Sequence, residues 1–284
     1  MRGTLQQYRV RSRARGSRIG AGGGATVASV NATHGEFLAA DRRTLRIEVG
    51  VMLAVTFGVS ALVAVFRLAD AVLSGLPAYR VRLNTNQSRF DLINLGLNLV
   101  SVGQLMAWGA LALYLLWRSG ISPAAIGLGR LRWRPDILGG IGLAALIGIP
   151  GLLFYLGART LGMNAEVEPA ALSSSWWRIP VLVLAAFANG FAEEVVVVGY
   201  LITRLRQLGM TPSQAVLTSS VLRGIYHLYQ GFGAGLGNVV MGLVFGYAWC
   251  RTGRLWPLVF AHGIINTVAF VGYVLLAGHL GWLR

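Results

Sequence analysis

Long apolar stretches separated by short polar segments dominate the chain from residue 44 onward. Most of them approach the roughly 20 residues that a helix needs to cross a bilayer. The stretches are Val49–Phe66, Leu92–Trp117, Ile137–Ala158, Ile179–Leu201, Ala215–Tyr229, Gly237–Cys250 and Leu255–Leu276. The fifth and sixth are short and rich in glycine, so one of them need not cross fully. The pattern predicts an all-α, polytopic membrane helix bundle with about seven transmembrane helices.

Residues 1–43 differ from the rest because they are polar, basic and rich in glycine and show neither helical nor strand periodicity. The first apolar run begins near Ile47, whereas the apolar core of a secretory signal lies within about the first 30 residues. We therefore expect residues 1–43 to form a disordered, Arg-rich cytoplasmic tail. Residues 44–284 are expected to form a transmembrane helical domain.

Composition excludes a soluble domain. Hydrophobic residues make up 55% of the chain and charged residues only 12%, with a mean hydropathy of +0.61, whereas about 25% charged residues is usual for soluble proteins. All 25 basic residues are arginines, and the formal net charge is +15. Beside a membrane span, arginines favour anionic lipid and the cytoplasmic side. The bilayer is thus an expected partner and nucleic acid is not.

The loop arginines predict an orientation. With the N-terminus in the cytoplasm, three inside loops carry Arg118, Arg130, Arg132 and Arg134, then Arg204 and Arg206, then Arg251 and Arg254. The first outside loop, with Arg80, Arg82 and Arg89, opposes this assignment. The majority still follows the positive-inside bias, so we expect a multi-pass protein of the cell membrane with a cytoplasmic N-terminus.

Ionisable residues lie inside three of the apolar stretches. The fourth contains Glu193 and Glu194, the fifth Arg223 and His227, and the seventh His262 and, four residues later, Asn266. An ionisable group at bilayer depth costs at least about 2.5 kcal/mol, so it marks a functional site by default. Residues four apart share a helix face. We expect these groups to converge, although a purely structural polar pair would also hold helices together.

The chemistry that fits this inventory is activation of a water molecule. A carboxylate and an imidazole can remove its proton, while nearby donors stabilise negative charge on a carbonyl oxygen. The same residues also suit a divalent metal such as zinc, with Glu193, His227 and His262 as the ligands. The chain has no His-Glu-x-x-His motif, the local signature of a zinc protease. Residue spacing leaves both mechanisms open.

Three segments resemble a known family in order. The segment Ala192-Glu-Glu-Val-Val-Val-Val-Gly-Tyr-Leu201 is similar to a first motif, Arg223-Gly-Ile-Tyr-His227 to a second, and Gly253-Arg-Leu-Trp-Pro-Leu-Val-Phe-Ala-His-Gly-Ile-Ile-Asn266 to a third. Together they resemble the CPBP (CAAX protease and bacteriocin-processing, ABI) intramembrane proteases, with a catalytic core at about 179–270. The resemblance implies a CAAX-type endopeptidase acting on a peptide or membrane-protein substrate, with metal dependence left open.

Carried over residue by residue, the resemblance implies that Glu193 and His227 activate the water. It implies that His262 and Asn266 stabilise the oxyanion and that Glu194 supports them. The family arginine is replaced by Val198, and the family phenylalanine by Arg223. We hypothesise that Arg223 supplies the missing partner of Glu194 from the neighbouring helix.

Two other readings stay open. A proton-coupled transporter could use the glutamates and histidines as a proton relay, although the chain shows no internal repeat of the kind found in transporters. A non-catalytic membrane scaffold or immunity protein could keep the fold after losing activity.

Overall fold

The computed structural model describes residues 41–276. The chain divides into residues 1–43 and residues 44–284, and the fold is that of the second part. The predicted tail lies outside the described residues except for residues 41–43, which begin the helix Asp41–Ala54. Whether the tail is disordered therefore stays a prediction.

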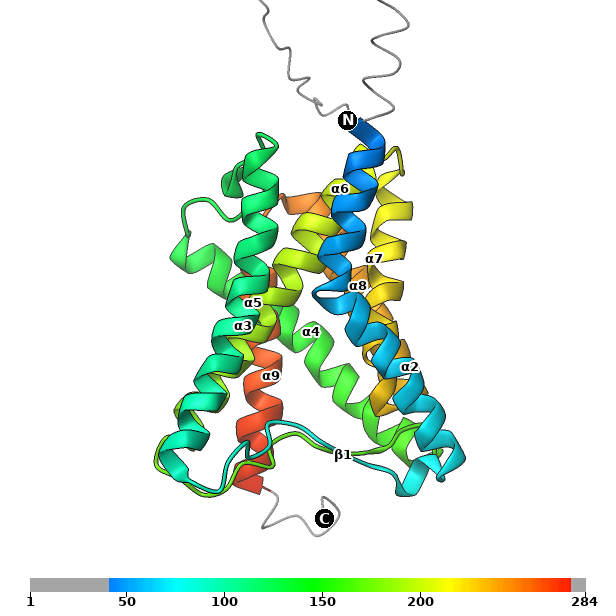
Figure 1. Ribbon diagram of the computed structural model, residues 1–284, viewed down its shortest axis with the longest axis vertical. Coiled ribbons are helices and arrows are strands. Elements are labelled where there is room, and N and C mark those ends of the chain that lie inside the picture. Colours follow the sequence, from blue (N-terminus) through cyan, green and yellow to red (C-terminus); the bar gives the residue numbers. More distant parts are fainter. Residues whose placement is uncertain (1–40, 277–284) are drawn as a thin grey trace, which may run out of the picture. The chain divides into compact units, whose positions relative to one another are not determined.

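Helices form most of the described chain, which confirms the all-α fold class (Figure 1). After the helix Asp41–Ala54, the α-helices are α2 (Phe57–Leu73), α3 (Asp91–Arg118), α4 (Trp133–Thr160), α5 (Arg178–Glu193), α6 (Thr203–Gln207), α7 (Pro212–Tyr226), α8 (Phe232–Thr252) and α9 (Trp256–Leu276). A π-helix, η3 (Glu194–Ile202), joins α5 to α6. Short 3₁₀ turns are η1 (Leu76–Ala78), η2 (Pro123–Ile126) and η4 (Leu228–Gln230).

Five described helices are long and apolar enough to cross a membrane, or six if the helix Asp41–Ala54 and α2, bent by 52° at their junction, count as one span. The remaining element of the seven expected is α7. Its 15 residues extend only about 22 Å at 1.5 Å per residue, less than the roughly 30 Å of the hydrocarbon core. The chain is thus a multi-pass membrane protein in which one predicted span is too short to cross.

The rod formed by α5, η3 and α6 is the centre of the bundle. Of its apolar window 67% is buried, against 11–33% for the other four candidate spans. In Figure 1 it rises between α3 on one side and α2 and α7 on the other. Helix α5 packs against α3 and α9, and α7 packs against α2 and α8. Glu193, Glu194 and Arg204 on this rod are consequently enclosed by protein, whereas Arg206 near its end is exposed.

Small residues allow two close helix crossings beside this rod. A Cβ atom at Gly190 of α5 would lie 2.9 Å from the backbone nitrogen of Gly263 in α9. A Cβ atom at Gly224 of α7 would lie 2.8 Å from the carbonyl oxygen of Gly235 in α8. Such small residues let membrane helices approach closely. The first crossing brings α9 directly against the glutamates at the end of α5.

Two short parallel strands, β1 (Arg80–Arg82) and β2 (Glu166–Glu168), cross one end of the bundle side by side (Figure 1). Strand β1 lies in the connection from α2 to α3, and β2 in the connection from α4 to α5. Arg82 Nε donates to Glu168 Oε2 at 2.8 Å, and Arg80 Nε lies 3.4 Å from Glu166 Oε2. The backbone pairing of the strands joins the two loops, and the exposed ion pairs add little to it.

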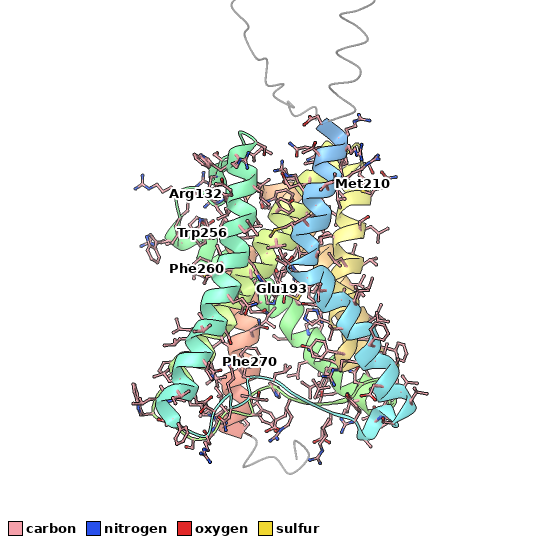
Figure 2. All side chains as sticks on the ribbon, in the orientation of Figure 1. Arg132, Glu193, Met210, Trp256, Phe260 and Phe270 are labelled. Atoms are coloured by element: carbon pink, nitrogen blue, oxygen red, sulfur yellow. The ribbon has the colours of Figure 1, made fainter. Side chains whose placement is uncertain are left out.

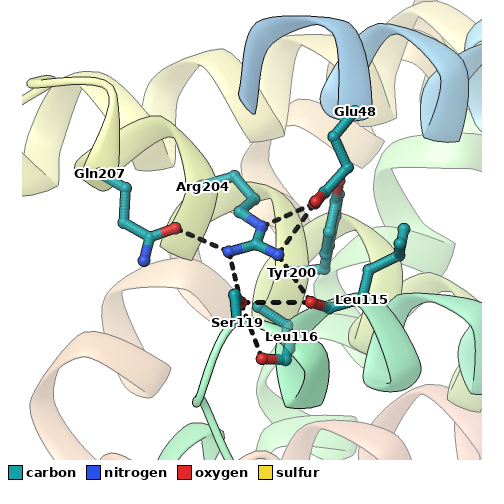
Figure 3. A network of polar contacts seen from close by, with 7 residues as sticks. All are labelled: Glu48, Leu115, Leu116, Ser119, Tyr200, Arg204 and Gln207. Carbon is teal, nitrogen blue, oxygen red and sulfur yellow. Dashed lines mark hydrogen bonds and ion pairs between the residues drawn. The ribbon is translucent and has the colours of Figure 1, made fainter. Parts of the chain in front are cut away.

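A polar network near the opposite end joins α6 to two other helices (Figure 3). The Arg204 side chain, only 1% exposed, donates from Nε to Glu48 Oε1 and from Nη2 to the Leu115 carbonyl oxygen, both at 2.9 Å. Its Nη1 donates to Ser119 Oγ and to Gln207 Oε1, each at 2.9 Å. Every nitrogen of this guanidinium therefore has a partner.

Candidate functional site

The adjacent carboxylates lie where the central rod changes from an α-helix to a π-helix. Glu193 is the last residue of α5 and Glu194 the first of η3. Figure 2 shows Glu193 between the two ends of the bundle, with Met210 toward one end and Phe270 toward the other. Ser219 of α7 donates to the carbonyl oxygen of Val197 at 2.6 Å, which satisfies a backbone group within the wide turn. π-Helical turns are frequent at functional sites.

Glu194 is fully buried and joins three helices. Its Oε1 accepts from Arg223 Nη2 of α7 at 2.7 Å and lies 2.7 Å from His262 Nδ1 of α9. Both Arg223 and Glu194 are 0% exposed. The Arg223–Glu194 ion pair across the helix interface is the contact that the relocation hypothesis requires. That it substitutes for an arginine at Val198 remains a hypothesis.

Glu193 is held by two neutral donors. Asn189 Nδ2, one turn earlier on α5, donates to Oε1 at 3.0 Å, and Tyr226 OH of α7 donates to Oε2 at 2.5 Å. The carboxylate also interacts electrostatically with His227, His262 and Arg223. Glu193 thus lies within the same cluster as Glu194 while its partners fix its orientation.

His227 follows the last residue of α7 and is its C-cap. Its Nδ1 lies 3.0 Å from the Arg223 carbonyl oxygen, four residues earlier. Because a carbonyl can only accept, Nδ1 carries the proton and Nε2 of a neutral ring remains an acceptor. The ring centroid lies 4.7 Å from that of Tyr226, the residue that binds Glu193. His227 is therefore a neighbour of the Glu193 carboxylate through Tyr226.

His262 and Asn266 lie one turn apart on α9. His262 is buried, with its ring 6.5 Å from Phe245, and its Nδ1 faces the Glu194 carboxylate. The Asn266 amide nitrogen is buried and has no hydrogen-bond partner among the described residues. The structure therefore brings Glu193, Glu194, Arg223 and His262 together, whereas Asn266 makes no hydrogen bond from its amide nitrogen to them.

The three residues suggested as metal ligands do not form a metal site in this arrangement. Within residues 41–276, no group of three or more His, Cys, Asp or Glu side chains is placed to hold a metal ion. Both Glu193 oxygens accept hydrogen bonds from Asn189 and Tyr226. As placed, Glu193, His227 and His262 do not share an ion, so no step below passes through one.

Tyr226 and Asn189 are candidate site residues that the sequence did not reveal. Each lies within an apolar stretch, where a single tyrosine or asparagine resembles an ordinary packing residue. A signal did exist for both. Asn189 precedes Glu193 by four residues, on the same helix face, and Tyr226 directly precedes His227. Neither spacing would have shown that both donate to the same carboxylate.

Comparison with known proteins finds a match over the segment that contains the candidate site. Residues 175–268 match the family model of type II CAAX prenyl endopeptidase Rce1-like proteins. This match, over about a third of the chain, confirms the resemblance of this segment to the CPBP (CAAX protease) family. That family consists, in general terms, of CAAX-type intramembrane proteases. No curated protein and no solved structure is significantly similar to the chain. The matched residues include every candidate site residue named above.

Proposed function

We propose that the chain is an intramembrane endopeptidase that hydrolyses a peptide bond with a water activated by Glu193 and His227. The observation that carries the proposal is the convergence of Glu193, Glu194 and His262 within the segment that matches the family. Buried ionisable groups at membrane depth mark functional sites. The substrate is a peptide or membrane protein.

The first half of the reaction needs a base and an oriented water. Asn189 and Tyr226 hold the Glu193 carboxylate, and the neutral His227 ring keeps Nε2 available as an acceptor. In the proposed step, the water oxygen bonds to the substrate carbonyl carbon while its proton passes to this pair. The carbonyl oxygen then carries the negative charge.

The second half needs stabilisation of that oxyanion and a proton for the leaving amine. His262 lies against Glu194, whose carboxylate fixes the orientation of the ring, in the manner of the buried aspartate of a catalytic triad. Asn266 offers an amide nitrogen without a protein partner. We assign oxyanion stabilisation to these two residues. As the carbon–nitrogen bond breaks, the proton taken from the water passes to the amine nitrogen.

The proposed location is the cell membrane with the N-terminus in the cytoplasm. The loop with Arg80, Arg82 and Arg89 is the exception to the positive-inside bias. The proposed orientation follows the arginines of the other three loops, because the bias counts basic residues and pairing with carboxylates does not change that count.

The experiment is a comparison of membrane proteomes from cells that carry wild type or Glu193→Gln. Glutamine keeps the size and the contact with Tyr226 but cannot take a proton, so we expect the wild-type fragments to fall by about a thousandfold. Arg89→Gln, an exposed surface change outside the site, is the matched control. Fragments that persist in Glu193→Gln would favour the scaffold reading, and ion transport that survives the same change would favour the transporter.

A further inference from the structure

A cavity of about 530 Å³ opens beside the candidate site. Its walls come from α2, from β1 with the flanking Tyr79 and Leu83, from the end of α7 and from η4. The wall residues used below are Arg67, Arg80, Arg82, Tyr226 and Tyr229. The cavity therefore connects a cationic strand at one end of the bundle to the region of the carboxylates.

Tyr226 places the inner end of this cavity at Glu193. Tyr226 lines the cavity, and its hydroxyl donates to Glu193 Oε2 at 2.5 Å. Phe57, the first residue of α2, stacks on Tyr226 with ring centroids 4.9 Å apart. A chain lying in the cavity would thus have one end beside the proposed catalytic carboxylate.

Strand β1 has one edge without a partner strand in the described part of the chain. Its hydrogen bonds to β2 include Glu166 N–H to the Tyr79 carbonyl at 2.8 Å and Leu83 N–H to the Glu168 carbonyl at 2.9 Å. Alternate residues of a strand turn their backbone groups to opposite edges. Arg80 and Arg82 therefore direct their N–H and C=O groups away from β2. Such an edge is a template for an added strand.

The positive charge on the cavity wall indicates which kind of peptide would bind there. Arg80 and Arg82 already pair with Glu166 and Glu168, and the hydrogen bond and charge of Glu168 raise the pKa of Arg82. Arg67 of α2 is exposed and forms no ion pair with any residue in 41–276. A guanidinium binds carboxylates with directional, charge-assisted hydrogen bonds. The cavity thus favours an acidic peptide.

We propose that the substrate binds as an extended strand along the free edge of β1, with the carboxylate of an internal Asp or Glu on Arg67. This proposal rests on the proposed endopeptidase function. Phe57 and Arg67 are ten residues apart in α2, which corresponds to about 15 Å along the helix. At about 3.3 Å per extended residue, the acidic residue lies about four or five residues from the scissile bond.

The test uses short, amidated peptides in which Asp, Asn or Lys is fixed at each position in turn, incubated with the full chain in lipid nanodiscs. We expect wild type to cleave most efficiently when Asp lies about four or five residues from the cleaved bond. Arg67→Gln is expected to lower kcat/KM for those peptides about tenfold or more. Arg67→Glu is expected to shift the preference to Lys, and Arg89→Gln, the same charge change outside the cavity, is expected to leave it unaltered.

Strand addition has a readout that a simple charge contact lacks. Methylation of one peptide nitrogen at a time removes single backbone donors from the best peptide. Because only alternate residues of an added strand bond to β1, we expect cleavage to fall at every second position. Equal sensitivity to methylation at all positions, or no sensitivity at any position, would contradict binding of the peptide as an added strand.

Binding separates failure of this proposal from failure of the proposed function. Fluorescently labelled acidic peptide is titrated against Glu193→Gln protein and against the double variant with Arg67→Gln. If the peptide binds in a way that depends on Arg67 but wild type does not cleave it, the proposed peptide-binding site stands and the proposed protease function is rejected. Cleavage indifferent to acidic residues, or absence of binding, would reject the site. If Arg67 favours a peptide only when its C-terminal carboxylate is free, the proposal that Arg67 binds an internal Asp or Glu side chain is rejected.

Discussion

Two buried arginines in the same bundle differ in how completely they are hydrogen-bonded. All three nitrogens of Arg204 have partners, whereas Arg223 bonds only through Nη2 and leaves Nε and Nη1 without partners. Of the six buried side-chain atoms without partners in residues 41–276, four belong to Arg223, Glu194 and Asn266. Buried polar groups are normally satisfied, so a cluster of exceptions requires an explanation.

The difference separates a structural network from a site. The Arg204 network joins helices, and all its guanidinium nitrogens are hydrogen-bonded within the protein. A fully hydrogen-bonded network of this kind stabilises one arrangement of the helices. The Arg223 cluster keeps donors and acceptors at the depth where the proposed reaction would supply an oxyanion and a leaving amine. Changes in the first should therefore alter stability, and changes in the second should alter catalysis as well.

The largest effect is expected for Arg223→Phe, which restores the family residue but leaves Glu194 without its cation. Loss of one partner from a buried ion pair costs about 3 to 5 kcal/mol. We expect a lower free energy of unfolding and loss of cleavage, measured by denaturant titration in micelles and by fragment yield.

The double variant Arg223→Phe with Val198→Arg tests the relocation itself. Val198 is buried in η3, within the same helical segment as Glu194. If the arginine only moved between helices, the second change should recover most of the lost stability and activity. A double variant no better than the single one would show that Arg223 has another role.

Asn266→Leu should lower kcat about a hundredfold, because removal of one oxyanion donor costs about 2.7 to 4 kcal/mol in the transition state. Its buried amide nitrogen has no partner to lose in the described fold, so stability should not fall. The pattern to look for is a reduced kcat at nearly constant KM and unchanged thermal unfolding. A fall in stability without a fall in kcat would assign Asn266 to packing alone.

Arg204→Met should show the opposite pattern. The change leaves Glu48 and several acceptors unpaired, but Glu48 is 25% exposed and water can solvate it in part. We therefore expect a loss of about 2 to 3 kcal/mol, below the cost for a fully buried pair. Activity per folded molecule should stay at the wild-type level. Loss of activity beyond the loss of folded protein would break the contrast between the two arginines.

The apolar stretches predicted most of the fold. A membrane-spanning segment must satisfy its backbone hydrogen bonds internally, so it forms a helix whose length is visible as a long apolar stretch in the sequence. The ion pair of Glu194 with Arg223 followed from a different signal: the family arginine is missing at Val198, and an arginine stands at 223 instead. The π-helix was not predictable in this way, because the valines at 195–198 are equally apolar in either helix type. Strands of three residues are too short for a periodic signal, and Arg204 resembled one more cytoplasmic loop arginine.

The smallest effect is expected from Gly190→Ala, which tests whether the α5–α9 crossing positions the site. The added Cβ would lie 2.9 Å from Gly263 N and 3.2 Å from His262 Cβ, so α9 must shift and the His262 contact with Glu194 must lengthen. We expect a loss of about 1 to 2 kcal/mol and a lower kcat. Gly142→Ala in α4 is the matched control, since its Cβ would meet nothing within 4 Å, and it should be neutral or stabilising by up to about 1 kcal/mol. If both variants behave alike, close approach of α5 and α9 is not what sets the geometry of His262, and the contrast between site and scaffold must rest on the charged groups alone.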